Sequence, residues 1–125
     1  MTIPDTLQYT KGHEWIEIEN GVATIGITDY AQGELGDIIF IEFPEAGDKF
    51  NAGDSIGTIE AVKTVADLFT PLSGEISELN LELEDDPEAI NKDPYNSGWI
   101  IKLKNIIKEE NSQLLTASKY KKYIN

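Results

Sequence analysis

Residues 57–67 decide the fold, and they read Gly57-Thr58-Ile59-Glu60-Ala61-Val62-Lys63-Thr64-Val65-Ala66-Asp67. Apolar and polar residues alternate on both sides of the centre, which is the period-2 pattern of two half-buried strands. We predict that these strands meet at a tight turn with Lys63 at or near its tip. A lysine on a short, rigid turn outside any pocket suits the attachment of a group that must reach away from the protein.

Other interpretations of Lys63 are open at this stage. A lone lysine is most often a solvated surface charge. Residues 57–64 come close to a phosphate-binding loop, but Val62 stands where that motif needs glycine so that backbone N–H groups can cradle phosphate. A Schiff-base lysine needs a desolvated amine or a cationic neighbour, whereas Glu60 and Asp67 favour the charged amine. An ordinary two-residue hairpin would carry Asn-Gly or Asp-Gly. We interpret Lys63 as the root of a covalent swinging arm.

The composition limits the classes of partner. A chain of 125 residues is expected to form one domain, residues 1–125, with a genuine core. The formal net charge of -13 argues against binding to nucleic acid or to anionic membranes and favours partners with basic docking faces. There is no cysteine, hence no disulfide or thiolate site. The opening residues 1–5 lack the features of a targeting segment, so we expect a cytoplasmic protein. We also expect a monomer.

The N-terminal part predicts a hairpin followed by a helix. Residues 13–19 alternate like a strand with one face toward a core, and residues 22–27 are a return strand apolar enough to lie centrally. Asn20-Gly21 between them is the strongest hairpin turn signal in the chain. A short helix follows, with Thr28 as a fair N-cap and Gly36 able to take the left-handed position just beyond its end. Gly33 inside this helix weakens it.

The rest of the chain adds short strands and then helices. Residues 91–98 are rich in turn formers and predict a loop, and the tail 109–125 has helical spacing, with Thr116 as a possible cap. Residues 44–49 and 71–76 share a proline-glycine-acid spacing that hints at two similar β units. Further strands are predicted at 38–43, 76–83 and 99–103. We therefore predict a mainly β fold, a flattened β barrel or sandwich with a short helix after the second strand and C-terminal helices packed outside.

No self-sufficient active site is apparent. His13 is the single histidine, and a structural role at the start of a strand is more common for such a residue than a role as a ligand or base. The acids lie on alternating or acidic runs that are typical of solvated faces. Asp85-Asp86 could hold a cation, but no calcium-loop spacing is present. We predict no catalytic and no metal-binding residue, and this favours a carrier over an enzyme.

Distinctive blocks follow one another along nearly the whole chain, and in order they are Leu7-x-Tyr9-Thr10, His13-Glu14-Trp15, Gly26 to Gln32, Leu35-Gly36-Asp37, Pro44-x-x-Gly47, Glu60-x-Val62-Lys63, Pro71-x-Ser73-Gly74-Glu75, Asn91-x-x-Pro94-Tyr95-x-x-Gly98-Trp99 and Tyr120-x-x-Tyr123-Ile124. Taken together, these blocks resemble the glycine cleavage H-protein family, which is of lipoyl/biotinyl-carrier type. By this resemblance, Lys63 carries lipoic acid in amide linkage. Ala61 stands where the family would have serine, which shifts the motif toward that of biotin carriers, but the methionines that flank a biotinyl lysine are missing.

The resemblance implies a cycle and a set of partners. A pyridoxal-phosphate glycine decarboxylase (P-protein) loads an aminomethyl group onto the arm, and a folate-dependent aminomethyltransferase (T-protein) removes it. Dihydrolipoyl dehydrogenase (L-protein) then reoxidises the arm, and lipoate-attaching enzymes install it. The chain itself shuttles and catalyses none of these steps. A relay that passes lipoate to other lipoyl proteins, a biotin carrier, and an acidic interaction module without a cofactor are the alternatives, and an independent enzyme ranks last.

Three acids around the arm carry further hypotheses. Glu14 lies between His13 and Trp15 at the start of a half-buried strand, where its carboxylate could hold the protonated amine at the end of the loaded arm. Asp67, near the root of the arm, is the second choice for that role. Glu60 is the candidate for recognition by the lipoylating enzyme, although it could equally be an ordinary strand-edge charge.

Overall fold

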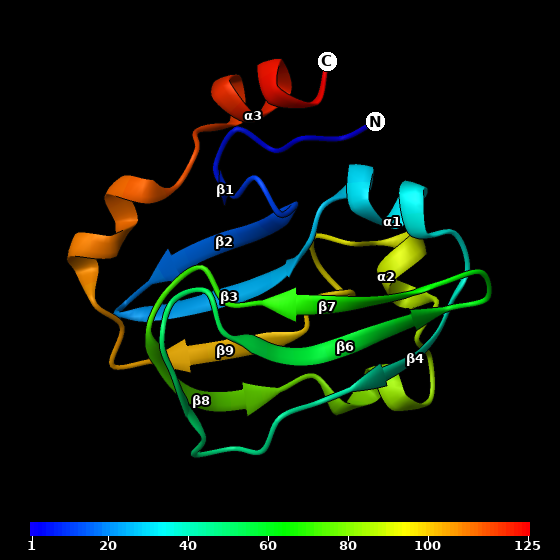
Figure 1. The fold of residues 1–125 in the computed structure, drawn as a ribbon, viewed down its shortest axis with the longest axis horizontal. Coiled ribbons are helices and arrows are strands. Elements are labelled where there is room, and N and C mark those ends of the chain that lie inside the picture. Colours follow the sequence, from blue (N-terminus) through cyan, green and yellow to red (C-terminus); the bar gives the residue numbers. More distant parts are fainter.

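Two antiparallel β-sheets form the body of the computed structural model, which describes residues 1–125 (Figure 1). The larger sheet has the strand order β1-β2-β3-β9-β8-β5 and the smaller one the order β4-β6-β7, so the sheets are separate rather than closed into a barrel. The strands are β1 (Gln8–Tyr9), β2 (Glu14–Glu19), β3 (Val22–Ile27), β4 (Ile38–Glu42), β5 (Lys49–Phe50), β6 (Ser55–Ala61), β7 (Val65–Phe69), β8 (Gly74–Leu79) and β9 (Ile101–Lys104). The helices are α1 (Asp29–Leu35), α2 (Ala89–Lys92), α3 (Ala117–Ile124) and the 3₁₀ turns η1 (Leu81–Glu84) and η2 (Lys108–Gln113).

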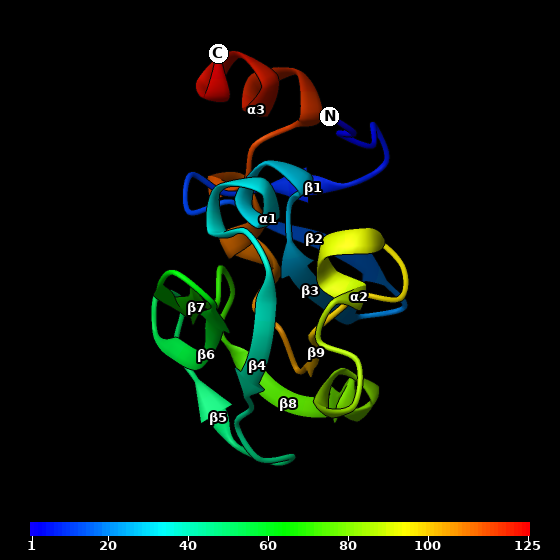
Figure 2. The same cartoon turned by 90° about the vertical axis from the view of Figure 1, so that its right-hand side faces the viewer.

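The core lies between the two sheets, which face each other across it (Figure 2). It is a cluster of 16 buried residues, to which both sheets contribute. Ile16 and Ile25 enter it from the larger sheet, and Ile41, Ile59 and Leu68 enter it from the smaller one. Each of these alternates with a more exposed neighbour, as a strand with one buried face requires. The predicted sandwich is therefore confirmed.

The N-terminal hairpin and helix also form as predicted. Glu19 pairs with Val22, and both turn residues have positive φ, 53° for Asn20 and 77° for Gly21, which is the backbone of the turn type that suits twisted strands. The hydroxyl of Thr28 accepts a hydrogen bond from the backbone N–H of Ala31 at 3.2 Å and so caps α1.

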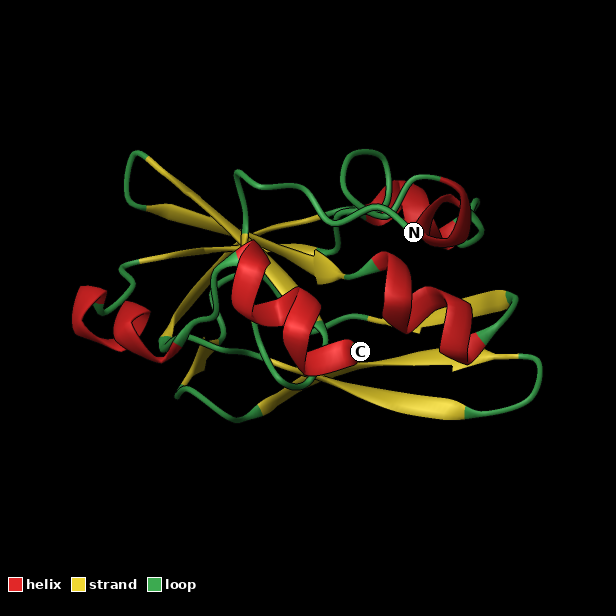
Figure 3. Ribbon diagram, turned by 90° about the horizontal axis from the view of Figure 1, so that it is seen from above, coloured by secondary structure: helices red, strands yellow, loops and turns green.

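The C-terminal helix closes a second, smaller core. Thr116 caps α3 by accepting a hydrogen bond from the Lys119 N–H at 3.2 Å. The ring of Tyr120 stacks on that of Tyr9, with centroids 4.7 Å apart, and both side chains are fully buried beside Trp15. The helices lie outside the sheets, as predicted (Figure 3).

Two local predictions were wrong. The alternation of residues 76–83 predicted one strand, but β8 ends at Leu79 and the chain turns into η1, where Leu81 is exposed and Leu83 is buried. The many turn-forming residues in 91–98 predicted a loop, but the short helix α2 extends to Lys92 before the turn begins. In both places side chains that pack against the core determine the local structure, which spacing alone does not reveal.

The two segments with the same proline-glycine-acid spacing, residues 44–49 and 71–76, lie side by side. Gly47 donates a backbone hydrogen bond to Ile76 at 2.8 Å, and Ile76 donates one to Asp48 at 2.8 Å. This pairing continues into β5 and β8, where Lys49 is opposite Glu75.

None of the helices is long and apolar enough to span a membrane.

Candidate functional site

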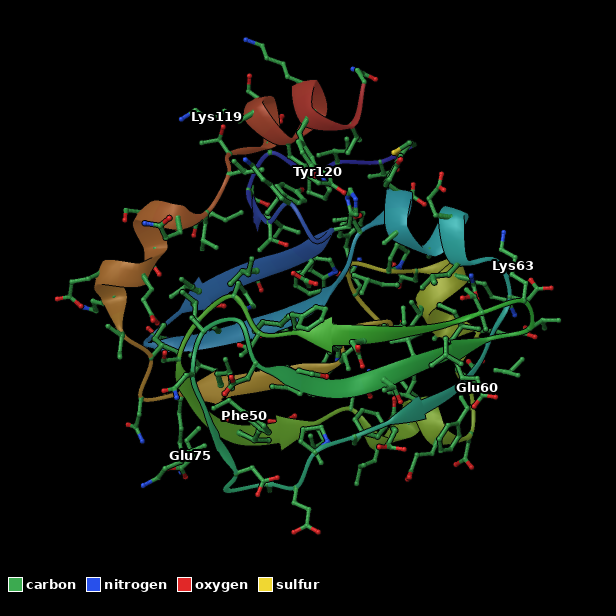
Figure 4. All side chains as sticks on the ribbon, viewed as in Figure 1. Phe50, Glu60, Lys63, Glu75, Lys119 and Tyr120 are labelled. Atoms are coloured by element: carbon green, nitrogen blue, oxygen red, sulfur yellow. The ribbon has the colours of Figure 1, made fainter.

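Lys63 lies at the tip of the β6–β7 hairpin, as the sequence predicted. β6 ends at Ala61 and β7 begins at Val65, so Lys63 is the middle residue of the connection. The Ala61 N–H donates to the Thr64 carbonyl at 2.8 Å, which closes the turn, and the Val62 N–H donates to the Asp37 carbonyl at 3.0 Å, which fastens the turn to the segment after α1. The side chain is exposed, and Figure 4 shows it at the end of the molecule where α1 and α2 lie. The amine therefore projects from a fixed root.

Gly36 gives the stem of Lys63 a place to lie. A Cβ built on Gly36 would be 3.4 Å from the Lys63 Cε, so the aliphatic stem rests against the end of α1. Gly36 also has a positive φ of 79°, as predicted from its position after the helix. The preceding residue, Leu35, lines the cleft described below, so the root of the arm lies beside one wall of that cleft.

Asn91 holds the segment beneath the hairpin tip. Its amide oxygen accepts from the Ile38 N–H at 3.0 Å, and its amide nitrogen donates to the Gln32 side chain at 3.0 Å and to the Gly36 carbonyl at 2.8 Å. These bonds join α2 to the end of α1 and the start of β4. The sequence placed Asn91 among turn formers and gave no sign of this role.

We expect Asn91→Ala to lower the free energy of unfolding by about 2–3 kcal/mol, because it removes three hydrogen bonds and leaves partly buried partners unpaired. Urea unfolding would measure this loss. We also expect faster hydrogen exchange of the Val62 amide, since that amide is bonded to the segment that Asn91 holds. Asn96→Ala is the control, because the exposed Asn96 side chain makes a single 3.4 Å bond to Asp93. Equal stability of the two variants would contradict the prediction.

A cleft of about 270 Å³ opens between the N-terminal turn, α1 and the β6–β7 hairpin. This is close to the lower end of the range for small-molecule sites, roughly 300–1,000 Å³. Apolar side chains form its walls, and three carboxyl groups and a histidine add polarity. Its lining residues are Gly12, His13, Glu14, Ile27, Tyr30, Ala31, Glu34, Leu35, Ile59, Ala66 and Asp67. An aliphatic chain with a polar end fits such a lining.

Glu14 is the most buried acid of the cleft, with 5% of its surface exposed. Its carboxylate accepts a 2.5 Å hydrogen bond from the Thr10 hydroxyl, and a Cβ built on Gly12 would be 3.0 Å from it. Burial raises the pKa of Glu14 above its ordinary value, while hydrogen bonds from Thr10 and from the backbone of Phe69 act in the opposite direction. The absence of a side chain at Gly12 thus leaves room for this carboxyl group against the backbone.

His13 connects the cleft to the C-terminal helix. It has a positive φ of 70°, and its Nδ1 lies 2.9 Å from the Tyr120 hydroxyl, which is 2.7 Å from the Thr28 hydroxyl. Its ring also lies 4.8 Å from that of Tyr30. Burial lowers the pKa of His13, against the opposing effect of the Glu34 carboxylate. The prediction of a hydrogen-bonded structural histidine agrees with these contacts, although the same residue lines the cleft.

The structure brings some of the predicted site residues together and separates others. Glu14 and Asp67 both line the cleft, whereas Glu60 is exposed on the outer face of the smaller sheet. Glu34 is a cleft acid that the sequence analysis missed, because nothing in a weak helix indicates which face it presents. Tyr120 was also missed as a contact of His13, 107 residues away in the chain.

Comparison with known proteins agrees with this architecture. A model of the glycine cleavage H-protein family matches residues 7–125. Glycine cleavage system H proteins from two strains of Staphylococcus epidermidis are 50% and 49% identical to this chain over 124 residues, covering 99% of this chain and 98% of each relative. A crystal structure of a glycine cleavage system H protein from Mycobacterium marinum is 42% identical, with a TM-score of 0.86 over 94% of this chain and 95% of that one.

These matches extend over nearly the whole chain and agree in sequence and in structure. The structural similarity confirms the predicted flattened sandwich of lipoyl-carrier type. Identity of about one half over full length is far above what a shared fold alone would give. The chain therefore belongs to the glycine cleavage H-protein family.

Proposed function

We propose that this protein is the lipoyl carrier of glycine cleavage, with lipoic acid in amide linkage to Lys63. The observation that carries the proposal is an exposed amine on a hydrogen-bonded hairpin turn whose stem lies beside an apolar cleft. When bound, the lipoyl group supplies a dithiolane that can accept the aminomethyl group of glycine and exchange electrons. The cleft residues Ile27, Leu35 and Ile59 offer apolar contact to such an arm, so the chain fits the group.

The chain holds the arm at its root, presents the end of the arm to the partner enzymes and shields the cargo from water. Lysine and a lipoyl chain together span roughly 14 Å, enough to enter the cleft of another protein. A fixed root keeps the end of the arm at high effective concentration for each docked partner. The proposed partners are the glycine decarboxylase, the aminomethyltransferase and the dihydrolipoyl dehydrogenase, and the chain carries cargo among them without a catalytic residue of its own. We propose that residues 1–125 form one domain, because both sheets share one core. We also propose that the protein is a cytoplasmic monomer.

Glu14 is proposed to hold a cationic amine at the end of the arm. Its carboxylate faces the cleft together with those of Glu34 and Asp67, and burial reduces the screening of its charge. An amine held there would be kept away from bulk water, which would slow the loss of the cargo. Only the ionised carboxylate attracts the cation, so retention is expected above the pKa of Glu14 and is lost as the pH falls through it.

We expect Glu14→Gln to shorten the lifetime of the aminomethyl cargo at neutral pH about tenfold, the rate equivalent of 1.4 kcal/mol. In the unsubstituted protein, release should accelerate as the pH falls through the pKa of Glu14, which burial raises and the bound cation lowers. Glu14→Gln should lack this step. Glu17→Gln is the control, because Glu17 is exposed on the same strand. Equal lifetimes for all three proteins would exclude Glu14 from this role.

Intact-mass spectrometry of the protein from its native host tests the proposal. We expect a mass gain of one lipoyl group, which peptide mapping places on Lys63. Reaction with avidin would indicate a biotin carrier, and an unmodified Lys63 would indicate an interaction module without a cofactor. Transfer of the lipoyl group from this chain to other lipoyl proteins, measured with purified components, would identify a lipoate relay.

A further inference from the structure

Large apolar side chains are exposed on the hairpin tip and on the strand beside it. The exposed fractions are 50% for Ile39, 50% for Phe40, 71% for Val62 and 61% for Val65. Together with Glu60, these residues form what we call the tip patch. Lone exposed apolar residues are ordinary, but a group of them beside a functional amine indicates an interaction site.

Strand register makes the tip patch continuous. Phe40 is opposite Glu60, and Glu60 is opposite Val65, so the three side chains form one row across β4, β6 and β7. Directly opposed Cβ atoms in such a row are about 4.5–5.5 Å apart. Ile41, next to Phe40 on β4, and Ile59, next to Glu60 on β6, are buried in the core. Since successive side chains of a strand point to opposite faces, the row faces away from the core. The fold gains no core contact from these exposed side chains.

We propose that the tip patch is the docking surface for the enzyme that acylates Lys63. This inference rests on the proposed function and adds to it the place where that enzyme binds. In the reaction, the deprotonated Nζ attacks the carbonyl carbon of an acyl adenylate and the C–N amide bond forms. The bond between that carbon and the phosphate oxygen breaks, AMP leaves with the electron pair, and the nitrogen loses its extra proton to solvent.

The reach of the lysine decides which partner covers the patch. A lysine side chain extends only about 6 Å from its Cα, so an enzyme that acylates Nζ comes close to Val62, next to Lys63, and to Val65 at the start of β7. Enzymes that act on the installed arm meet it roughly 14 Å from the root and need not cover the hairpin. The tip patch is therefore matched to the enzyme that installs the arm rather than to those that use it.

The charges beside the patch indicate the chemistry of the partner. Glu60 is inside the row, and Glu42, two residues from Phe40 on the same strand, is exposed on the same face. The strands β4, β6 and β7 contain no lysine or arginine. A complementary surface has an apolar pocket for Phe40 and Val65 with a basic rim.

The test is the rate at which a purified lipoate ligase, with lipoate and ATP, modifies the unlipoylated protein, followed by intact mass. We expect Phe40→Thr to lower kcat/KM about tenfold, mainly through KM, because it removes an exposed aromatic side chain that the docked enzyme would bury. Leu81→Thr is the matched control, since Leu81 is 53% exposed but lies in η1, outside the patch. Glu42→Lys should lower kcat/KM and its dependence on salt, whereas Glu17→Lys, with the same change in net charge, should not.

The outcomes separate this inference from the proposed function. If the unsubstituted protein gains no lipoyl group on Lys63, the proposed function fails. If it is modified and Phe40→Thr matches Leu81→Thr, the docking inference alone is overturned. If Phe40→Thr is modified normally but the loaded variant fails in glycine cleavage, the patch serves a later enzyme and the assignment is wrong. Circular dichroism checks folding, and Val65→Thr replaces Phe40→Thr if the latter does not fold.

Discussion

We expect the Lys63→Arg variant to be a folded protein that gains no lipoyl group and supports no glycine cleavage. Arginine preserves the positive charge and the length of an exposed side chain that makes no core contact, so stability should be unchanged. Its guanidinium stays protonated and does not offer the free amine that acylation needs. The expected effect is complete loss of modification, measured by intact mass, and of glycine-dependent carbon dioxide release in a reconstituted system.

Lys119→Arg is the control for this experiment. Lys119 is also exposed, but it lies on α3, well away from the hairpin (Figure 4). We expect this variant to be lipoylated and active like the unsubstituted protein. A lipoyl group found on Lys63→Arg, or normal glycine cleavage by it, would refute the role of Lys63.

Gly57→Ala is expected to be the most destabilising single-methyl change in the hairpin. A Cβ built on Gly57 would overlap the backbone oxygen of Glu42 on the neighbouring strand, next to the register shift in the pairing of β6 with β7. Backbone cannot rotate away as a side chain can, so the strands must separate. We expect a loss of about 3 kcal/mol in the free energy of unfolding, measured by urea titration. Because this hairpin carries Lys63, lipoylation should also slow.

The same substitution in α1 should have the opposite sign. A Cβ built on Gly33 meets nothing within 4 Å, and Gly33 lies inside the helix. Gly33→Ala should therefore stabilise the protein by about 0.5–1 kcal/mol, because alanine has less backbone freedom to lose on folding. If both variants lost stability equally, the close approach of β4 to β6 would not explain the result for Gly57→Ala.

Local chemistry predicted the parts of this fold that depend on neighbours in the chain. The turn at Asn20-Gly21, the cap at Thr28 and the position of Lys63 at a hairpin tip all follow from a few adjacent residues. Each of these features is set by backbone preference or by one short-range hydrogen bond.

The cleft could not be predicted in the same way. Its walls come from the turn before β2, from α1 and from the β6–β7 hairpin, and the chain brings them together only when both sheets pack. Glu14 was singled out for its position on a strand, but Glu34 had no comparable signal. Asn91 has a composition typical of turns, and its three hydrogen bonds exist only because α2 packs beside α1.

The contacts at both chain ends have a practical consequence for anyone who labels or fuses this protein. The Thr2 N–H donates to Asp29 at the start of α1, and Tyr120 reaches His13 five residues before the C-terminus. A reporter fused to either end would disturb α1 or His13, both of which line the cleft. Glu14 and Ile27, which line the cleft, pair at one end of the β2–β3 hairpin, and the Asn20-Gly21 turn lies at the other end (Figure 1). This turn is therefore the better insertion point for an affinity handle or dye.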